Sequence, residues 1–291
     1  MALQLRLMVE SAINCMILFN GISMINFELL SNSRAELGEG ISITQSKNQI
    51  MWVDILGNRV FTKNLGTEKE QVFTKFLHPS CTFPDDENGF FISHSNGISW
   101  VDFQGRNLQH CVSWFSSDSG LRCNDGTMDG NGNIWISTMS TEQLKNEGTI
   151  WFWNRKSKPI KIIDNLTIPN SIAVDHERKR LYFADSLDHS IYFLDIKSEG
   201  HMGSLNDFYT SSLGVPDGST LDSEGNLWNT RWDGSSIIKI TPDGNLDLKI
   251  SVPFARPTSC VFGKSSNQLY VTSATFPDDK NSGHSVLLLI D

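Results

Sequence analysis

Ile134-Trp135-Ile136 is one of six short apolar runs that recur along the chain at nearly equal intervals. The six runs are Ile50-Met51-Trp52, Phe90-Phe91-Ile92, Ile134-Trp135-Ile136, Leu181-Tyr182-Phe183, Leu227-Trp228-Asn229 and Leu269-Tyr270-Val271, and successive runs begin 40, 44, 47, 46 and 42 residues apart. Periods of roughly 40–50 residues are typical of solenoids and propellers. The β-branched and aromatic side chains of the runs favour strands, which indicates a propeller.

Each apolar run lies inside a repeat that contains further strand-like segments. A segment of small residues such as Ser171-Ile172-Ala173-Val174 precedes the run, and a turn such as Asp129-Gly130-Asn131-Gly132-Asn133 joins the two. A second apolar segment such as Ile191-Tyr192-Phe193 follows, and five repeats have a fourth, outer segment such as Pro159–Ile163. Six repeats of four strands predict an all-β fold, a six-bladed β-propeller.

The sixth repeat has no outer segment, because the chain ends at Asp291 directly after its third one. A candidate lies at the other end of the chain, where residues Ile25–Leu30 alternate in apolar character. We expect this N-terminal strand to close the last blade and to remove an exposed sheet edge. The propeller is therefore predicted to span residues 25–291, with residues 1–24 as an N-terminal extension outside the fold.

The bulk properties exclude some classes of function and indicate a compartment. Acidic residues outnumber basic ones by 33 to 24, and no stripe of Lys and Arg is present, so we expect no nucleic-acid partner. The five cysteines are scattered and show no zinc or disulfide spacing, as expected in a reducing cytosol. Leu7–Ser23 resembles a secretory signal, but Glu10 interrupts it. We expect a cytoplasmic protein without membrane contact, and a signal or anchor in residues 1–24 is the alternative.

One position of the repeat, ten or eleven residues before each apolar run, carries the strongest functional signal. It is occupied in turn by Glu39, Pro79, Asn124, Asn170, Asp217 and Thr258. A fixed offset in a repeat is a fixed place in the fold, so these side chains should meet at the axis of the ring. Four of them carry carboxylate or amide oxygens, which suit Ca²⁺, Mg²⁺ or Mn²⁺, and Zn²⁺ and Fe²⁺ also accept carboxylates.

The alternative interpretation of this recurring position is that Asn and Asp only cap strand ends, since both residue types favour turns. Two acids, Glu39 and Asp217, would however repel each other at the axis unless a cation neutralised them. Arg122, two residues before Asn124, would lie at the same mouth or else form a surface salt bridge. We therefore predict one divalent cation at the axis.

Five short motifs in order resemble those of the senescence-marker-protein, gluconolactonase and luciferin-regenerating-enzyme family. They are Leu37-Gly38-Glu39-Gly40, Arg122-Cys123-Asn124-Asp125-Gly126, Ile168-Pro169-Asn170-Ser171, Val215-Pro216-Asp217-Gly218 and Pro257-Thr258-Ser259-Cys260-Val261-Phe262-Gly263. The resemblance runs from about Ile25 to the C-terminus. It implies a six-bladed propeller that holds one divalent cation at its axis and hydrolyses sugar lactones.

The resemblance also implies roles for individual residues. Glu39, Asn170 and Asp217 would bind the metal, and the substrate-binding positions would be Arg122, Asn124 and Glu142, the last of these in the polar loop Ser140–Glu147. One departure is Ile41-Ser42-Ile43, where the family usually has Pro-Val-Trp. This changes the packing of the inner strand near Glu39 but leaves the ligand in place.

The function that these observations favour is metal-dependent hydrolysis of a small-molecule sugar lactone to the open-chain sugar acid, with Asp217 as the general base. Two other functions remain open at this point. The protein could bind calcium in a regulatory role without catalysis, or the propeller could be a protein-interaction scaffold. The sequence does not indicate the sugar, the ring size, the physiological metal or the oligomeric state.

Overall fold

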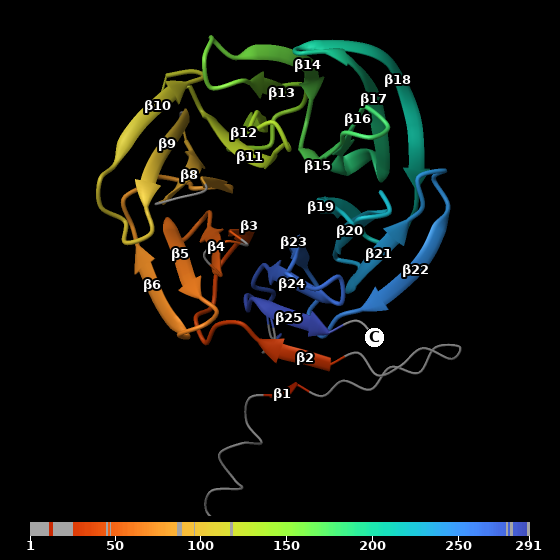
Figure 1. Cartoon of the computed structure of the whole chain (residues 1–291). Helices are drawn as coiled ribbons and strands as arrows, with labels where there is room; N and C mark the ends of the chain where they lie inside the picture. Colours follow the sequence, from red (N-terminus) through yellow and green to blue (C-terminus); the bar gives the residue numbers. More distant parts are fainter. Residues whose placement is uncertain are drawn as a thin grey trace, which may run out of the picture.

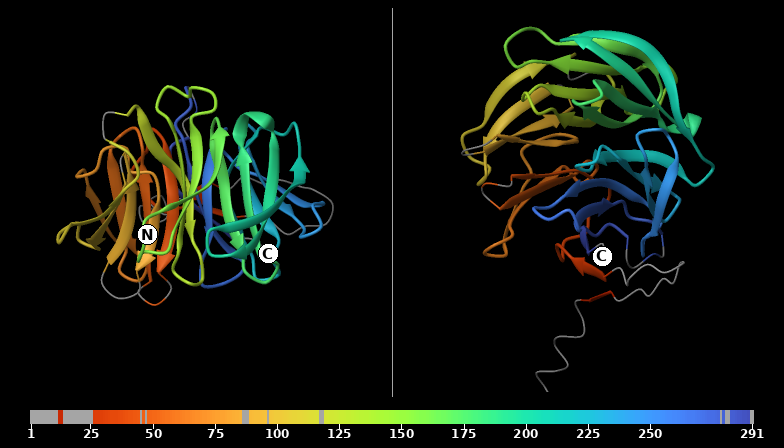
Figure 2. Two further views of the ribbon diagram at one scale, coloured as in Figure 1. Left: turned by 90° about the horizontal axis from the view of Figure 1, so that it is seen from above. Right: turned by 45° about the vertical axis from the view of Figure 1, so that its right-hand side comes forward.

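The strands form separate antiparallel sheets arranged around one axis (Figure 1). The computed structural model describes residues 12–13, 26–44, 46, 48–85, 89–95, 97–116, 119–277, 279 and 282–289. In this part of the chain there are six sheets, five with four strands and one with five. Each sheet is a blade whose strands run between the two faces of a disc (Figure 2). The predicted all-β class and propeller architecture are confirmed.

The blades follow one another along the chain, each with its first strand nearest the axis. Blade 1 contains β3 (Gly38–Thr44), β4 (Gln49–Asp54), β5 (Arg59–Asn64) and β6 (Lys69–Phe73), and blade 2 contains β7 (Thr82–Asp85), β8 (Gly89–His94), β9 (Gly97–Asp102) and β10 (Gln109–Ser113). Blade 3 contains β11 (Leu121–Met128), β12 (Ile134–Ser140), β13 (Gly148–Trp153) and β14 (Ile160–Leu166).

The second half of the ring repeats this order. Blade 4 contains β15 (Pro169–Asp175), β16 (Arg180–Asp185), the 3-10 helix η1 (Ser186–Asp188), β17 (Ser190–Ser198) and β18 (His201–Thr210). Blade 5 contains β19 (Val215–Leu221), β20 (Leu227–Trp232), β21 (Ser236–Ile240) and β22 (Leu246–Ser251). Blade 6 contains β23 (Pro257–Phe262), β24 (Gln268–Ser273), β25 (Val286–Leu289), β2 (Asn26–Leu29) and β1 (Ala12–Ile13).

The two ends of the chain close the ring together. β2 pairs antiparallel with β25, with Phe27 opposite Leu288, which is the pairing predicted for the N-terminal strand. β1 then pairs with β2 and places Ile13 opposite Phe27, so a short part of residues 1–24 joins the sheet although none was expected to. β1 thus occupies the edge of β2 that β25 leaves free, where the backbone groups of β2 would otherwise be unpaired. The rest of the predicted extension lies outside the described residues.

The apolar runs that predicted the fold form the second strands of the blades and are buried between neighbouring sheets. Met51 and Val53 of blade 1, for example, pack with Phe90 and Ile92 of blade 2. The inner strands need small residues because they converge on the axis. A Cβ atom on Gly40, whose φ is +54°, would collide with the carbonyl of Ser80.

Among the described residues there is no helix with the length and apolar character required to cross a membrane.

Candidate functional site

The recurring position of the repeats lies at an irregularity of the inner strand. The strand register shifts between Glu39 and Ser42, between Cys123 and Gly126, between Asn170 and Ala173, between Pro216 and Ser219, and between Pro257 and Cys260. A bulge in a strand changes the direction of the side chains beside it. The same bulge in five blades therefore gives the residues at this position a common orientation at the axis.

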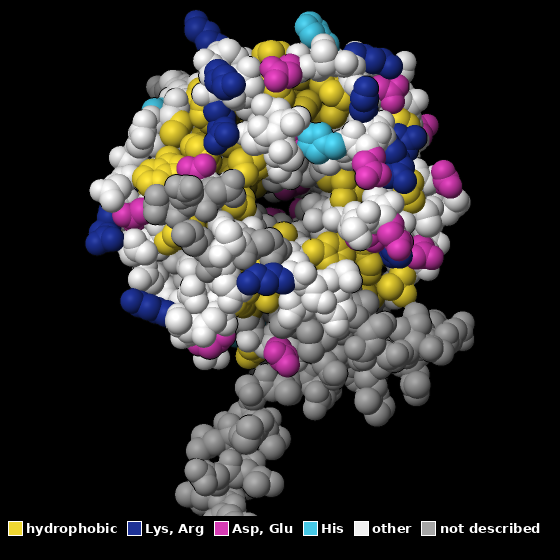
Figure 3. Space-filling model, viewed as in Figure 1, with side chains coloured by type: hydrophobic (Ala, Val, Ile, Leu, Met, Phe, Trp, Pro, Cys, Tyr) yellow, Lys and Arg dark blue, Asp and Glu magenta, His cyan; other side chains and the backbone are white. Residues whose placement is uncertain are grey.

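Four of the residues at this position meet in one cavity of about 230 Å³, to which Arg122 also contributes. The described residues that line it are Leu37, Glu39, Arg122, Asn124, Met139, Gln143, Ile168, Asn170, Ser186, Leu187, Val215, Asp217 and Trp232. Acidic side chains are visible deep in the central opening of the molecule (Figure 3). The structure thus brings together five of the six predicted site residues, which are Glu39, Arg122, Asn124, Asn170 and Asp217.

Glu142 is the predicted site residue that the structure does not bring to the cavity. Its side chain is exposed, and among the described residues of the loop after β12 it is Gln143 that lines the cavity. Gln143 adopts a left-handed conformation with φ of 56°. Glu142 therefore does not line the cavity in this structure and its neighbour Gln143 does, while the substrate-binding role of Glu142 stays a prediction.

A chain of hydrogen bonds crosses three blades beneath the cavity. Arg122 Nη1 donates to Asn124 Oδ1 at 2.8 Å, and Asn124 Nδ2 donates to Asn170 Oδ1 at 2.9 Å. Asn170 Nδ2 donates to Ser186 Oγ at 2.9 Å, and Ser186 Oγ donates to the carbonyl of Pro216 at 2.8 Å, next to Asp217. Because each amide has partners at both ends, the orientation of the two Asn side chains is determined by the fold.

The two acids of the cavity are difficult to ionise together. Burial, and then the charge of Asp125, raise the pKa of Glu39 to about 8. Burial and the nearby charge of Glu39 raise the pKa of Asp217 well above its usual range. The Arg122 guanidinium acts in the opposite direction and lowers the pKa of both carboxyls, although burial lowers its own pKa. The repulsion between like charges that the sequence predicted is thus present.

The donor set fits a hard divalent cation. Two carboxylates and the amide oxygen of Asn170 line the same cavity, and oxygen ligands are those that such cations prefer. A cation would also relieve the repulsion between Glu39 and Asp217. The described residues contain no cluster of three His, Cys, Asp or Glu side chains that could bind a metal. A cation at this site would therefore need an amide oxygen as its third side-chain ligand.

Asp125 is a third acid at the axis, and the sequence analysis missed it. It is buried, and its carboxylate accepts the N–H of Gly126 at 2.8 Å and that of Ile172 in blade 4 at 2.8 Å. Burial raises its pKa to about 6 in spite of these hydrogen bonds. It lines a separate cavity of about 190 Å³ along the inner strands. The sequence signal for Asp125 was its position directly after Asn124. Consecutive residues of a regular strand point to opposite faces, however, and only the bulge in β11 brings both Asn124 and Asp125 to the axis.

The loops that carry the site are held by charged residues at the ends of the second strands. Asp54 accepts the N–H groups of Glu36 and Leu37 at 3.1 and 3.0 Å, just before Glu39. Asp185 accepts the N–H groups of Thr167 and Ile168 at 2.7 and 2.9 Å, just before Asn170.

Arg231 also holds a loop of the site, but it donates to backbone carbonyls where Asp54 and Asp185 accept backbone N–H groups. It is fully buried and donates to the carbonyls of Ser211, Leu213 and Gly214 ahead of Asp217. Each of these three charged residues follows the first residue of its apolar run by four positions, a regularity that sequence inspection could have found.

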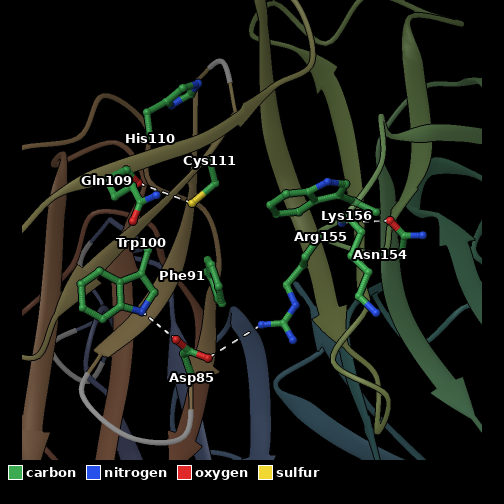
Figure 4. Close-up of a pocket in the computed structure, with 10 residues that line it drawn as sticks. Asp85, Phe91, Trp100, Gln109, His110, Cys111, Asn154, Arg155 and Lys156 are labelled. Carbon is green, nitrogen blue, oxygen red and sulfur yellow. Dashed lines mark hydrogen bonds and ion pairs between the residues drawn. The ribbon is translucent and has the colours of Figure 1, made fainter.

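A larger cavity of about 650 Å³ lies between blades 2 and 3, away from the axis (Figure 4). Its acid, Asp85, accepts a hydrogen bond from Trp100 Nε1 at 2.8 Å and lies 3.8 Å from Arg155 Nη1. This carboxylate thus already has a hydrogen-bond donor and a cation of the protein as partners. The axial cavity is smaller, but it alone of the two combines a pair of acids with amide donors, so we take it as the candidate site.

Comparison with known proteins identifies the family of the chain. Residues 37–275 match the sequence model of the SMP-30/gluconolactonase/LRE-like region. The chain belongs to this family. The resemblance inferred from the five motifs is therefore confirmed.

Individual relatives extend over most of the chain. An L-arabinolactonase of Azospirillum brasilense is 27% identical over 254 residues, covering 84% of this chain and 83% of that protein. Regucalcin of Xenopus laevis is 25% identical over 263 residues, covering 87% and 88%. A solved structure of a regucalcin from Agrobacterium tumefaciens, described as calcium-binding, superposes with a TM-score of 0.84 at 26% identity and covers 90% of this chain and 92% of that one.

Proposed function

We propose that this protein hydrolyses a sugar lactone to the open-chain sugar acid with the help of one divalent cation. The observation that carries the proposal is the sharing of one small cavity by two acids with raised pKa values, the half-buried Glu39 and the buried Asp217, with two oriented amides and an arginine. Membership of a family that includes gluconolactonases supports the class of substrate. A cavity of about 230 Å³ suits a single ring, since drug-sized ligands occupy roughly 300–1,000 Å³.

Glu39, Asn170 and Asp217 are the residues that would hold the cation, which is Ca²⁺, Zn²⁺, Mg²⁺, Mn²⁺ or Fe²⁺. When bound, the cation supplies positive charge that polarises a carbonyl and lowers the pKa of water. The hydrogen bond from Asn124 keeps Asn170 Oδ1 in a defined direction. Asn124 Oδ1 accepts from Arg122, and a ligand oxygen next to a guanidinium would weaken cation binding, so we assign Asn124 to the substrate.

The chain's own groups supply the proton transfers and the orientation. A carboxylate oxygen of Asp217 accepts a proton from the attacking water, whose oxygen forms a bond to the lactone carbonyl carbon. Arg122 stabilises the negative charge that develops on the carbonyl oxygen. Both N–H groups of Asn124 already donate to the carbonyl of Pro169 and to Asn170 Oδ1, so Asn124 orients Arg122 and offers the substrate its Oδ1 as an acceptor. The bond between the carbonyl carbon and the ring oxygen then breaks, and the proton on Asp217 passes to that ring oxygen. The product is a hydroxy acid, so water is the only co-reactant.

Calcium binding without catalysis is the second candidate, because the structurally similar regucalcin of Agrobacterium tumefaciens is described as calcium-binding. Arg122 argues against it, since a positive charge beside the donors lowers the affinity for a cation and is useful only if a substrate oxygen is also present.

The test is a chelator-treated full-length protein, assayed on gluconolactone, galactonolactone and a pentonolactone with each of the five metals. Restored hydrolysis with a divalent ion supports the proposal. Calcium binding, measured by calorimetry, with no hydrolysis of any of the lactones would favour the regulatory function instead.

A further inference from the structure

The recurring position of the repeats, which lies at the axis, is called the axial position below. The residues that precede it by two in the sequence form a second layer of the cavity. Side chains two residues apart in a strand lie on the same face, and about 7 Å separates them. Leu37, Arg122, Ile168 and Val215 occupy this place in four blades, and all four line the cavity. All four are partly exposed, as are Glu39 and Asn124 at the axial position, whereas Asn170 and Asp217 are buried. In blades 4 and 5 this layer therefore lies on the solvent side of the donors, and three of its four residues are aliphatic.

The strand ends and the 3-10 helix add further apolar groups to the same wall. Met139 at the end of β12, Leu187 in η1 and Trp232 at the end of β20 line the cavity beside the aliphatic layer. Leu187 is 55% exposed although it is a large apolar residue at the mouth. Exposed apolar groups at the edge of a cavity are typical of surfaces that a ligand covers.

Two polar groups of this wall, the Ser186 hydroxyl and Nη1 of Arg122, are engaged by the protein itself. Ser186 Oγ donates to the carbonyl of Pro216 and accepts from Asn170. Arg122 Nη1 donates both to Asn124 and to the carbonyl of Cys123. Gln143 is exposed at the mouth. A ring whose outer carbons all carry hydroxyl groups would place several of them against side chains that offer no hydrogen bond.

We propose that the sugar lactone this cavity prefers carries an alkyl group on its outward side, as a deoxy-sugar lactone does, where a fully hydroxylated aldonolactone carries hydroxylated carbons. The inference rests on lactone hydrolysis at the axial site, as proposed above. A hydroxyl that loses water without gaining a partner opposes binding, whereas an apolar group gains from contact with Leu37, Ile168 and Val215.

Three δ-lactones with the same ring size test the inference on the metal-loaded, full-length protein. They are D-glucono-δ-lactone, its 6-deoxy analogue, which lacks one hydroxyl, and δ-nonalactone, which has a butyl substituent and no hydroxyl. We expect kcat/KM to increase in this order, by about tenfold or more between the first and the last, since one methylene in an apolar pocket changes discrimination by roughly 10–200-fold. Spontaneous hydrolysis is subtracted with protein-free samples.

Variants at Val215 and Leu187, two apolar residues that line the cavity, test whether these side chains cause the preference for less hydroxylated lactones. Val215→Thr keeps the shape of the side chain and adds a hydroxyl, and Leu187→Ser removes the apolar group at the mouth. We expect each to lower the ratio of kcat/KM for δ-nonalactone to that for D-glucono-δ-lactone, by about tenfold for the first. Leu205→Ser is the matched control, because Leu205 is 53% exposed on the outer strand β18, and its ratio should equal that of the wild type.

The outcomes separate this inference from the proposed function. Higher kcat/KM for D-glucono-δ-lactone than for the two less hydroxylated lactones would overturn the inference and leave lactone hydrolysis standing. An unchanged ratio in Val215→Thr and Leu187→Ser would overturn it as well. Hydrolysis of none of the lactones with any of the five metals would overturn the proposed function, and the inference with it.

Discussion

Asn124 Nδ2 lies 2.9 Å from Asn170 Oδ1 and joins the inner strands of blades 3 and 4 at the axis. The two residues are 46 positions apart, about one repeat, and occupy the same place in successive blades. Asn124 also receives a hydrogen bond from Arg122 at 2.8 Å. Asn124 therefore orients both Arg122, which we propose binds the substrate, and Asn170, which we propose binds the metal.

The first prediction concerns this amide. Replacing Asn124 by Ala removes the partner of both Arg122 and Asn170. We expect kcat/KM to fall about 100-fold, because Arg122, the proposed donor to the developing oxyanion, loses the acceptor that orients it. Metal affinity should fall about tenfold, since second-sphere partners typically contribute 10–100-fold. Steady-state kinetics and calorimetric metal titration measure the two effects. Equal kinetics in the variant and the wild type would contradict the role assigned to Asn124.

Asp217 provides the second prediction. Asp217→Ala should abolish turnover, and Asp217→Asn, which keeps the size of the side chain but cannot accept a proton, should lower kcat by roughly 10²–10⁴-fold. Without metal, the Asn variant should unfold at a higher temperature than the wild type, because one of the two acids that repel each other in the cavity is gone.

The same two proteins test the cation site through their stability. A divalent ion at about 100 times its dissociation constant should stabilise the wild type by about 2.7 kcal/mol. It should stabilise Asp217→Asn far less, because a ligand carboxylate is missing. Thermal unfolding in EDTA and in each divalent ion measures both effects, and full activity in Asp217→Ala would refute the mechanism.

The third prediction uses the pH dependence of Asp125. Its pKa of about 6 in the folded state exceeds the usual 3.8, so the folded protein binds this proton more tightly than the unfolded chain. The stability that it contributes is therefore complete below the unfolded pKa and is lost as the pH rises through 6. From about pH 4.5 to about pH 7.5, Asp125→Asn should gain roughly 2 kcal/mol relative to the wild type, at about 1.4 kcal/mol per pKa unit.

Urea unfolding of both proteins in EDTA at the two pH values measures this difference. Acidic groups that do not interact with Asp125 titrate alike in both proteins and are subtracted in the comparison. Glu39 and Asp217, whose pKa values the charge of Asp125 raises, add to the difference in the same direction. A stability difference that does not change with pH would contradict the position of Asp125 at a buried place on the axis.

Asp54 is the subject of the fourth prediction. It is buried, and three backbone N–H groups and the guanidinium of Arg59 lower its pKa although burial opposes them. Asp54→Ala leaves the N–H groups of Glu36 and Leu37 without their acceptor and should lower the free energy of unfolding by about 3 kcal/mol. Metal affinity should also fall, because the loop that carries Glu39 loses its anchor.

Denaturant unfolding and metal titration measure these two effects. Asp164→Ala is a suitable control, since Asp164 is exposed and pairs only with the side chains of Lys161 and Asn165 in the described structure. The contribution of Asp54 has the opposite pH dependence to that of Asp125. Its pKa is lowered, so its stabilisation is present above the unfolded pKa and is lost as the pH falls.

The sequence alone determined the all-β propeller, the pairing of the N-terminal strand with the last blade and the recurring position that supplies Glu39, Asn124, Asn170 and Asp217. These features follow from periodicity, because each repeat obeys the same local rules of strand, turn and burial. A common offset in the repeats therefore becomes a common place around the axis.

The tertiary structure decided the details that depend on contacts between repeats and on irregular backbone. A bulge in β11 brings Asp125 to the axis beside Asn124, and a left-handed residue in a loop brings Gln143 to the cavity in place of Glu142. Asp54 anchors a loop 17 and 18 residues before it in the chain. Bulges, loop turns and hydrogen bonds between distant residues have no period, so counting along the chain could not reveal them.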